Sequence, residues 1–323
     1  MQKILLLVMS LLCFGSVEAQ IYGDVNGDDY VTSADVTALY NFMLSNDMTG
    51  IVNGDLNNDG FITSADVTAV YDVMLGNVQP NPPQYIDYTV NGVTFRMIYV
   101  KGGTFMMGNE AVESESPVHS VTVTDFYMGE TECTQALWKA LFPDFAYFEK
   151  VGDDKPCNGQ LYSETLQFIT ALNDYLHESG QLPADKNFML PTEAQWEWAA
   201  RGGIKSQGYT YAGSNDFNEV AWCAQNSNYD LHDVKLKAPN ELGLYDMSGN
   251  AYEATTDNFS DDYSWATDGE VDPTGSPTPS SRGITRRGGG YAHDAYRSTV
   301  TKRDFYDTDT GGSEDQSFRL ILK

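Results

Sequence analysis

Two stretches near the start of the chain place oxygen-bearing residues at the same spacing, which is the pattern of a metal-binding loop. Counted from its first aspartate, each stretch carries such residues at positions 1, 3, 5, 9 and 12. These are Asp24, Asn26, Asp28, Thr32 and Asp35 in one, and Asp55, Asn57, Asp59, Thr63 and Asp66 in the other. A hard cation such as calcium takes six to eight oxygens, and the carbonyl at position 7, from Tyr30 or Phe61, supplies another. The spacing therefore predicts two calcium sites.

The two stretches belong to a longer repeat, in which 15 of 24 positions are identical. Position 12 is aspartate rather than glutamate, so the chain has to approach the ion more closely. Position 6 is Gly60 in the second loop but Asp29 in the first. Because that turn favours a positive φ, which Asp adopts less readily than Gly, we expect weaker binding by the first loop. The alternative, two solvated acidic turns, does not explain five ligand positions repeated in register.

Each loop is followed by one amphipathic helix. Its apolar positions are Val36, Leu39, Tyr40 and Met43 in the first copy and Val67, Val70, Tyr71 and Met74 in the second. A duplicated EF-hand-like loop and single helix, with aspartate at position 12, resembles a type I dockerin over residues 20–78. The resemblance implies a small all-α module that docks onto a cohesin-bearing scaffold protein. It assigns partner recognition to Ser33, Ala34, Ser64 and Ala65.

The composition and the first residues indicate where the protein works. The chain has 46 acidic and 19 basic residues and a formal net charge of −27, which argues against a nucleic-acid or anionic-membrane partner. Residues 1–19 combine Lys3, an apolar run and a small residue, Ala19, as in a secretory signal peptide. The run is too short to span a membrane. We therefore expect a secreted protein of bacterial type, in an extracellular or cell-surface assembly, without a membrane span.

Three cysteines follow the predicted leader, namely Cys133, Cys157 and Cys223. At most one internal disulfide can form among them, and Cys133 with Cys157 is the first pair to test. The alternative is three small buried residues.

A proline-rich linker at 79–85 precedes a larger domain at 86–323. There, residues 88–100 alternate like a strand with a turn at Asn91-Gly92. Helices are predicted at 163–179 and 190–203, the second with Thr192 and Gln195 as a capping box. The remainder is rich in Gly, Asn, Asp and Tyr, which predicts an α+β domain with much irregular structure.

Six strings in this domain occur in a characteristic order: YVKGGTFMMGNE, TECTQALWKAL, LPTEAQWEWAARGG, PNELGLYDMSGNAYEA, RRGGGY and SFRLIL. They resemble the sulfatase-modifying-factor family, which includes the formylglycine-generating enzymes. The resemblance implies a C-type-lectin-like α+β fold. In that family, two cysteines shortly after the Gly-Gly-Ser-aromatic string bind copper(I), which prefers soft thiolates.

The residues that would carry this chemistry are absent here. Gly288–Tyr291 is followed by His293 near the first thiolate position, and no cysteine follows Cys223. We therefore expect no copper, no catalytic residue carried over from the family, and no formylglycine-generating oxidase activity. The sequence leaves open an enzyme of the family with a different chemistry, or one in which the three cysteines converge on the Gly288–Tyr291 loop.

Two binding sites remain as expectations for the large domain. The resemblance implies a third calcium ion, held by Asp246, Glu253 and the carbonyls of Gly249 and Ala251; the alternative is a loop closed by hydrogen bonds. A ligand loop of Tyr291, His293, Tyr296 and Arg297 offers stacking and hydrogen-bonding groups suited to a glycan or peptide. The favoured interpretation is thus a dockerin-tagged binding or structural component of an extracellular, polysaccharide-handling assembly.

Overall fold

The computed structural model describes residues 23–28, 30–45, 47–56, 61–75, 82–145, 148–308 and 312–323. The predicted leader, residues 79–81 of the predicted linker and the loop residues Asp29, Asn57, Asp59 and Gly60 lie outside these ranges. The chain divides into two compact units between Pro83 and Gln84. Across the described residues, none of the helices combines the length and apolarity needed to cross a membrane.

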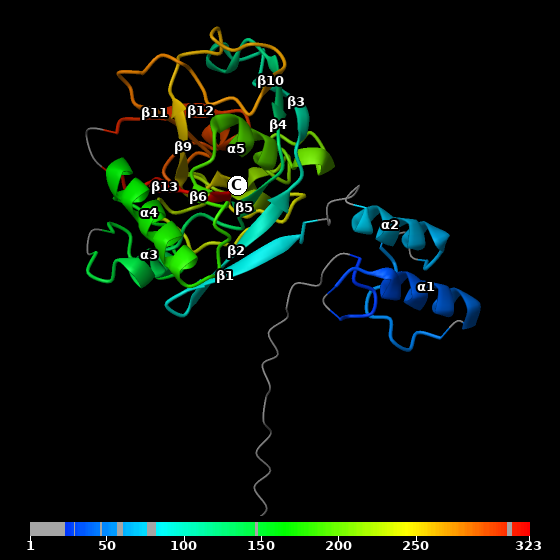
Figure 1. Ribbon diagram of the computed structural model, residues 1–323. Helices are drawn as coiled ribbons and strands as arrows, with labels where there is room; N and C mark the ends of the chain where they lie inside the picture. Colours follow the sequence, from blue (N-terminus) through cyan, green and yellow to red (C-terminus); the bar gives the residue numbers. More distant parts are fainter. Residues whose placement is uncertain are drawn as a thin grey trace, which may run out of the picture. The chain divides into compact units, whose positions relative to one another are not determined.

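The first unit contains two helices, α1 (Ser33–Ser45) and α2 (Ser64–Met74), each preceded by its loop (Figure 1). Its core pairs equivalent residues of the two repeats: Val25 with Leu56, Val36 with Val67, and Leu39 with Val70 are all buried. The other predicted apolar positions differ, because Tyr40, Met43, Tyr71 and Met74 are 41–47% exposed. Two short helices share only one contact surface, so apolar residues beside it remain half exposed.

The second unit begins with a five-stranded sheet in the order β1-β2-β5-β14-β6. Its strands are β1 (Tyr85–Val90), β2 (Val93–Val100), β5 (Phe126–Gly129), β14 (Ile321–Leu322) and β6 (Phe188–Met189). The predicted hairpin is confirmed: Asn91 and Gly92, with φ of 46° and 86°, turn the chain between β1 and β2. Helix α3 (Gln135–Leu141) contacts β1 and β2, and α4 (Tyr162–Glu178), within one residue of its predicted ends, contacts α3 and β6 (Figure 1).

Three smaller sheets complete the unit. One contains β3 (Gly103–Met107), β4 (His119–Val123) and β10 (Glu270–Val271), in the order β10-β4-β3. A four-stranded sheet has the order β12-β11-β9-β13, with β9 (Tyr252–Asn258), β11 (Ile284–Arg287), β12 (Arg303–Tyr306) and β13 (Gln316–Phe318). The third pairs β7 (Ala221–Trp222), which follows the short helix α6 (Phe217–Val220), with β8 (Ser248–Gly249). The predicted α+β class is confirmed.

Helix α5 (Glu193–Ala200) lies inside this unit, in contact with β3, β4, β9 and β11 (Figure 1). All eight of its residues are buried. The predicted capping box is present: Thr192 Oγ1 accepts a hydrogen bond from the Gln195 N–H at 3.2 Å, and Gln195 Oε1 accepts one from the Thr192 N–H at 2.9 Å. Buried carboxylates need positively charged partners. Glu193 and Glu197 of α5 find them in arginines of the surrounding strands.

Candidate functional site

In both predicted calcium loops, the side chain of the last aspartate accepts hydrogen bonds from backbone groups near the two ends of the loop. Asp35 Oδ1 accepts a hydrogen bond from the Val25 N–H at 2.8 Å, and its Oδ2 accepts one from the Thr32 N–H at 2.7 Å. Asp66 makes the equivalent bonds to the N–H groups of Leu56 and Thr63, both at 2.8 Å. Neither aspartate has any exposed surface. The duplicated sequence thus produces the same inward-facing carboxylate twice.

The remaining oxygens of the first loop bend the chain through local turns. Asp24 Oδ1 accepts from the Gly27 N–H at 2.7 Å, Asn26 Oδ1 from the Asp28 N–H at 2.9 Å, and Asp28 Oδ1 from the Tyr30 N–H at 3.0 Å. The aromatic side chains of Tyr30 and Phe61 are each 70% exposed. Because these rings are exposed to solvent, the predicted ligands at position 7 remain the backbone carbonyls of the two residues.

The donor chemistry of these loops fits calcium. Residues 20–84 contain no lysine, arginine or histidine, so no basic side chain of this segment can offset the buried charges of Asp35 and Asp66. Buried charges need a partner or a metal ion. No three His, Cys, Asp or Glu side chains within the described ranges are grouped closely enough to hold a metal ion by themselves. Amide, hydroxyl and carbonyl oxygens would have to complete each site, and the individual ligands stay predictions.

The predicted recognition residues Ser33, Ala34, Ser64 and Ala65 are exposed at the starts of α1 and α2. Each pair follows a threonine that caps its helix: the hydroxyl oxygens of Thr32 and Thr63 accept hydrogen bonds from the N–H groups two residues on, both at 3.1 Å. Near the other end of the helices, Leu44 and its repeat equivalent Leu75 are 86% and 71% exposed. The module therefore presents two similar surfaces.

The donor set expected for a third calcium ion is buried and partly engaged by other side chains. The set consists of Asp246, Gly249, Ala251 and Glu253, all of which are buried. The Glu253 carboxylate accepts from Arg319 Nη2 at 2.7 Å through Oε1 and from Trp196 Nε1 at 2.7 Å through Oε2. Arg319 therefore offsets the charge of Glu253, but Asp246 Oδ1 is buried without a hydrogen-bond partner among the described residues, and the calcium assignment stays a prediction. Asp246 bonds the Lys235 N–H at 2.8 Å, and burial raises the pKa of Asp246 to about 6.

His293, which the family resemblance implies lies near the position of the first thiolate, is paired with an aspartate. His293 Nε2 lies 2.7 Å from Asp315 Oδ2, and the Ser313 hydroxyl donates to Asp315 Oδ1 at 2.5 Å. The edge of the His293 ring also meets Tyr252, with 5.3 Å between the ring centroids. Although burial works to raise it, the pKa of Asp315 lies below its usual value because His293 and Ser313 hydrogen-bond the carboxylate.

The predicted ligand loop divides between surface and interior. Tyr296 is 55% exposed, the side chains of Arg297 and His293 are about one-third exposed, and Tyr291 is buried. A chain of polar contacts connects His293 with Arg297 through largely buried side chains, in the order His293, Asp315, Arg286, Asp304 and Arg297, with separations of 2.7, 3.8, 3.1 and 3.2 Å. The result is a patch of mixed charge with aromatic rings beside it.

The cysteines do not assemble a copper site on this loop. The segment of Cys223 meets the residues after Gly288–Tyr291, where the Ala224 N–H donates to the His293 carbonyl at 2.9 Å. Cys223 has no exposed surface, and burial raises the pKa of its thiol. Cys133 and Cys157 belong to a separate core cluster with α3 and α4. A single buried thiol beside a histidine–aspartate pair does not fit the two thiolates that hold copper(I).

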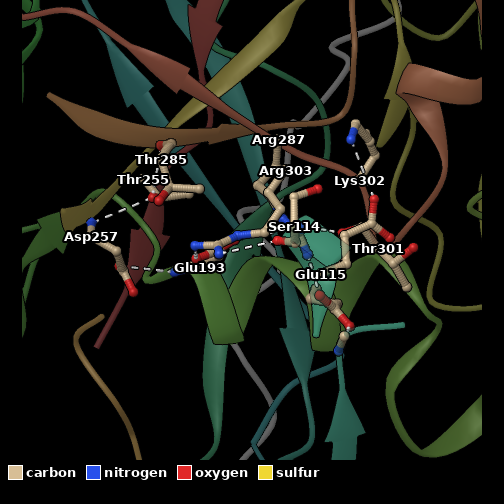
Figure 2. A network of polar contacts seen from close by, with 12 residues as sticks. Ser114, Glu115, Glu193, Thr255, Asp257, Thr285, Arg287, Thr301, Lys302 and Arg303 are labelled. Atoms are coloured by element: carbon tan, nitrogen blue, oxygen red, sulfur yellow. Dashed lines mark hydrogen bonds and ion pairs between the residues drawn. The ribbon is translucent and has the colours of Figure 1, made fainter. Parts of the chain in front are cut away.

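A network of buried polar contacts that sequence reasoning missed surrounds the start of α5 (Figure 2). Arg303 Nε and Nη2 donate to the two carboxylate oxygens of Glu193, each at 2.8 Å, and Asp257 Oδ2 accepts from the Glu193 N–H at 3.0 Å. Arg287 pairs with Glu197. These bonds join α5 to β9, β11 and β12, and the ligand loop lies in the chain between β11 and β12. The only signal in the sequence was acidic residues inside an otherwise apolar helix string.

Comparisons with known proteins agree with this geometry. The sulfatase-modifying factor enzyme 1-like domain model matches residues 90–323, and the dockerin type I domain model matches residues 22–71. The chaperone protein LppX of Paenibacillus barcinonensis is 27% identical over 267 residues, which cover 70% of this chain and 88% of that protein. The inactive C-alpha-formylglycine-generating enzyme 2 of Mus musculus is 26% identical over 213 residues, or 50% of this chain and 69% of that protein.

Among solved structures, Treponema denticola variable protein 1 superposes with a TM-score of 0.65 at 26% identity, over 74% of this chain and 99% of that one. From residue 90 to its last residue, the chain therefore belongs to the sulfatase-modifying factor enzyme 1-like family, and a dockerin type I domain precedes that region.

Proposed function

We propose that this chain is a secreted, calcium-dependent docking component that carries a non-oxidising binding domain into an extracellular, polysaccharide-handling assembly. The observation that carries the proposal is the His293–Asp315 pair, because the family resemblance implies a copper-binding thiolate near His293. The name of the mouse relative describes an inactive member of the same family, which supports a role without oxidation. The dockerin domain supplies the docking function, since such domains generally bind cohesins.

The docking surface comprises the two recognition pairs at the starts of α1 and α2. Because the surfaces are alike, either can bind a cohesin, but one cohesin binds at a time. Ser33→Lys with Ala34→Lys should leave much of the affinity for an immobilised cohesin, and adding Ser64→Lys with Ala65→Lys should abolish it. Met48→Lys, at an exposed position outside both helices, is the control. Complete loss from one substituted pair would show that the repeats are not interchangeable.

The large domain binds its ligand, a glycan or a peptide, on the patch around Tyr296 and Arg297. Aromatic rings and paired charges of both signs suit ligands rich in hydroxyl and amide groups. A glycan and peptide array should identify a ligand whose binding is lost in Tyr296→Ala. Tyr85→Ala, which removes a tyrosine exposed to a similar extent (49%) on β1, is the matched control. Equal loss in both variants, or none in either, would count against this patch.

One observation favours a second candidate, an enzyme with altered chemistry. Asp315 holds His293 through Nε2, an arrangement that also orients imidazoles that act as general bases. Once a ligand is known, its conversion to a product by the wild-type protein, but not by His293→Ala, would replace the binding role with this one.

A further inference from the structure

Cys133 and Cys157 lie directly opposite each other across a short antiparallel pairing. Thr134 and Pro156 form an isolated bridge, and the Gln135 N–H donates to the Lys155 carbonyl at 2.9 Å. On the other side of the bridge, the Cys157 N–H donates to the Cys133 carbonyl at 2.8 Å. Opposite residues of an antiparallel pair direct their side chains to the same face. The two sulfurs therefore share one side of this pairing.

The sulfurs also share one acceptor. Cys157 Sγ lies 3.4 Å and Cys133 Sγ 3.8 Å from the Thr134 carbonyl oxygen. Within the described residues, only one backbone hydrogen bond joins the two cysteines, because the Cys133 N–H donates to the Phe318 carbonyl at 2.9 Å. Directly opposite residues of antiparallel strands have Cα atoms about 4.5–5.5 Å apart, and disulfides bridge Cα separations of about 4.4–6.8 Å. A bond between the two cysteines thus needs rotation of the side chains rather than movement of the backbone.

We propose that Cys133 and Cys157 form a disulfide when the chain folds in an oxidising compartment. The two thiols are unbonded in the structure. The reaction is exchange with a protein or small-molecule disulfide: one cysteine thiolate attacks it to give a mixed disulfide, and the second displaces the other half. Two thiols of this chain are oxidised to one disulfide, while the donor disulfide is reduced to two thiols.

The bond would close a loop that reaches the ligand patch. The cysteines are 24 residues apart in the sequence. Within that interval, Lys150 Nζ lies 3.4 Å from Asp230 and 5.7 Å from the centroid of the Tyr291 ring. The Asp154 carbonyl accepts a hydrogen bond from the Val234 N–H at 2.9 Å. The disulfide would therefore join the two ends of a segment that lies against Tyr291, the buried residue of the ligand loop.

The surroundings of the pair determine when it can react. Cys133 lines a cleft of about 410 Å³ between β2, β5 and the start of α3, whereas Cys157 has no exposed surface. Burial raises the pKa of the Cys157 thiol well above its ordinary value. Because the thiolate is the attacking species, exchange in the folded protein is slow, and the bond forms during folding.

Trypsin separates the three cysteines into peptides 102–139, 151–186 and 206–235, because Lys155 precedes a proline and is not cleaved. The full chain is exported to a bacterial periplasm, purified without reductant, alkylated and digested. We expect peptide 102–139 joined to 151–186, about 2 Da below the sum of the reduced peptides, and alkylated Cys223. Three alkylated thiols, or a link that includes Cys223, would overturn the proposal.

A thermal measurement tests whether the bond is structural. Breaking a disulfide that closes a loop of this length should lower the Tm of the large domain by about 6–12 °C. Reductant should therefore lower the Tm of the wild-type protein and of Cys223→Ala, with calcium present throughout. The Tm of Cys133→Ala with Cys157→Ala should not respond to reductant. An equal response in all three proteins would contradict the assignment. If the variants do not fold, the peptide map of the wild-type protein still tests the disulfide, because it needs no variant.

Discussion

At the scale of single residues, the large domain depends on buried arginines whose partners come from distant parts of the chain. The side chain of Arg303 has no exposed surface. It holds both oxygens of Glu193 and donates through Nη1 to the Ser260 carbonyl at 3.1 Å. A planar guanidinium makes these bonds together, whereas an ammonium group cannot.

Arg303→Lys should therefore lower the free energy of unfolding by about 2–4 kcal/mol, because part of a buried carboxylate loses its donor. Arg282→Lys is the matched control, since Arg282 pairs with Asp261 where the side chains are 50% and 74% exposed. An exposed pair contributes only about 0–1 kcal/mol. Urea unfolding followed by tryptophan fluorescence measures the large domain alone, because all five tryptophans lie there. Similar losses in the two variants would contradict the role of Arg303.

Single residues were predictable where the sequence repeats them and unpredictable where a distant partner decides. The inward-facing roles of Asp35 and Asp66 followed from their equal positions in two copies of one loop. Glu253 was assigned to calcium from its place in a string. The structure also pairs Glu253 with Arg319, which is 66 residues away, and no local pattern indicates that the two meet.

At the scale of elements, the start of α5 is held by Asp257, a carboxyl group that stays protonated to an unusually high pH because it is buried. Burial, followed by the charge of Glu193, raises the pKa of Asp257 to about 7. The folded state therefore keeps a proton that the unfolded chain releases at lower pH. The resulting stability is complete below the unfolded pKa near 4 and is lost as the pH rises through about 7.

Asp257→Asn removes this titration and keeps an oxygen that can accept the Glu193 N–H. Between pH 5 and pH 8, the free energy of unfolding of the wild-type protein should fall by about 1–3 kcal/mol more than that of the variant. Urea unfolding of both proteins at the two pH values gives this difference directly. Parallel pH profiles would show that Asp257 does not titrate in this range.

Helices α1 and α2 should depend on calcium in a way that α4 does not. Without a cation, the acidic loops bring like charges together in a segment that has no basic residue. Hydrogen exchange of the full chain, read by mass spectrometry, should show loss of protection in α1 and α2 when a chelator is added. Protection of α4 serves as the internal control. Helices α1 and α2 that stay protected in chelator would contradict the calcium assignment.

Elements with local signals were predicted well. The β1–β2 hairpin followed from Asn91-Gly92, and the start of α5 followed from Thr192 and Gln195. The four-stranded sheet was not predicted, because its strands are short and pair across long separations, as in the parallel register of Gln316 with Tyr252. Such pairings depend on the packing of the whole domain rather than on any local pattern.

At the scale of the whole molecule, two compact units have separate cores and separate chemistry. The front unit carries the predicted calcium loops and exposed apolar residues. The large unit carries the mixed-charge patch near Arg297 and the buried network around α5. The order of the family strings was enough to predict the fold of the large unit. Its activity depends on two thiolates that this chain lacks, so the fold alone does not establish oxidation.

The central claim is that the large domain does not oxidise cysteine, and one measurement tests it most directly. The full chain is incubated with a Cys-x-Pro-x-Arg peptide, copper, oxygen and a thiol reductant, beside an active formylglycine-generating enzyme and a heat-killed sample. Mass spectrometry should find the peptide unchanged by this chain and converted by the active enzyme. A loss of about 18 Da from the peptide with this chain, absent from the heat-killed sample, would contradict the account.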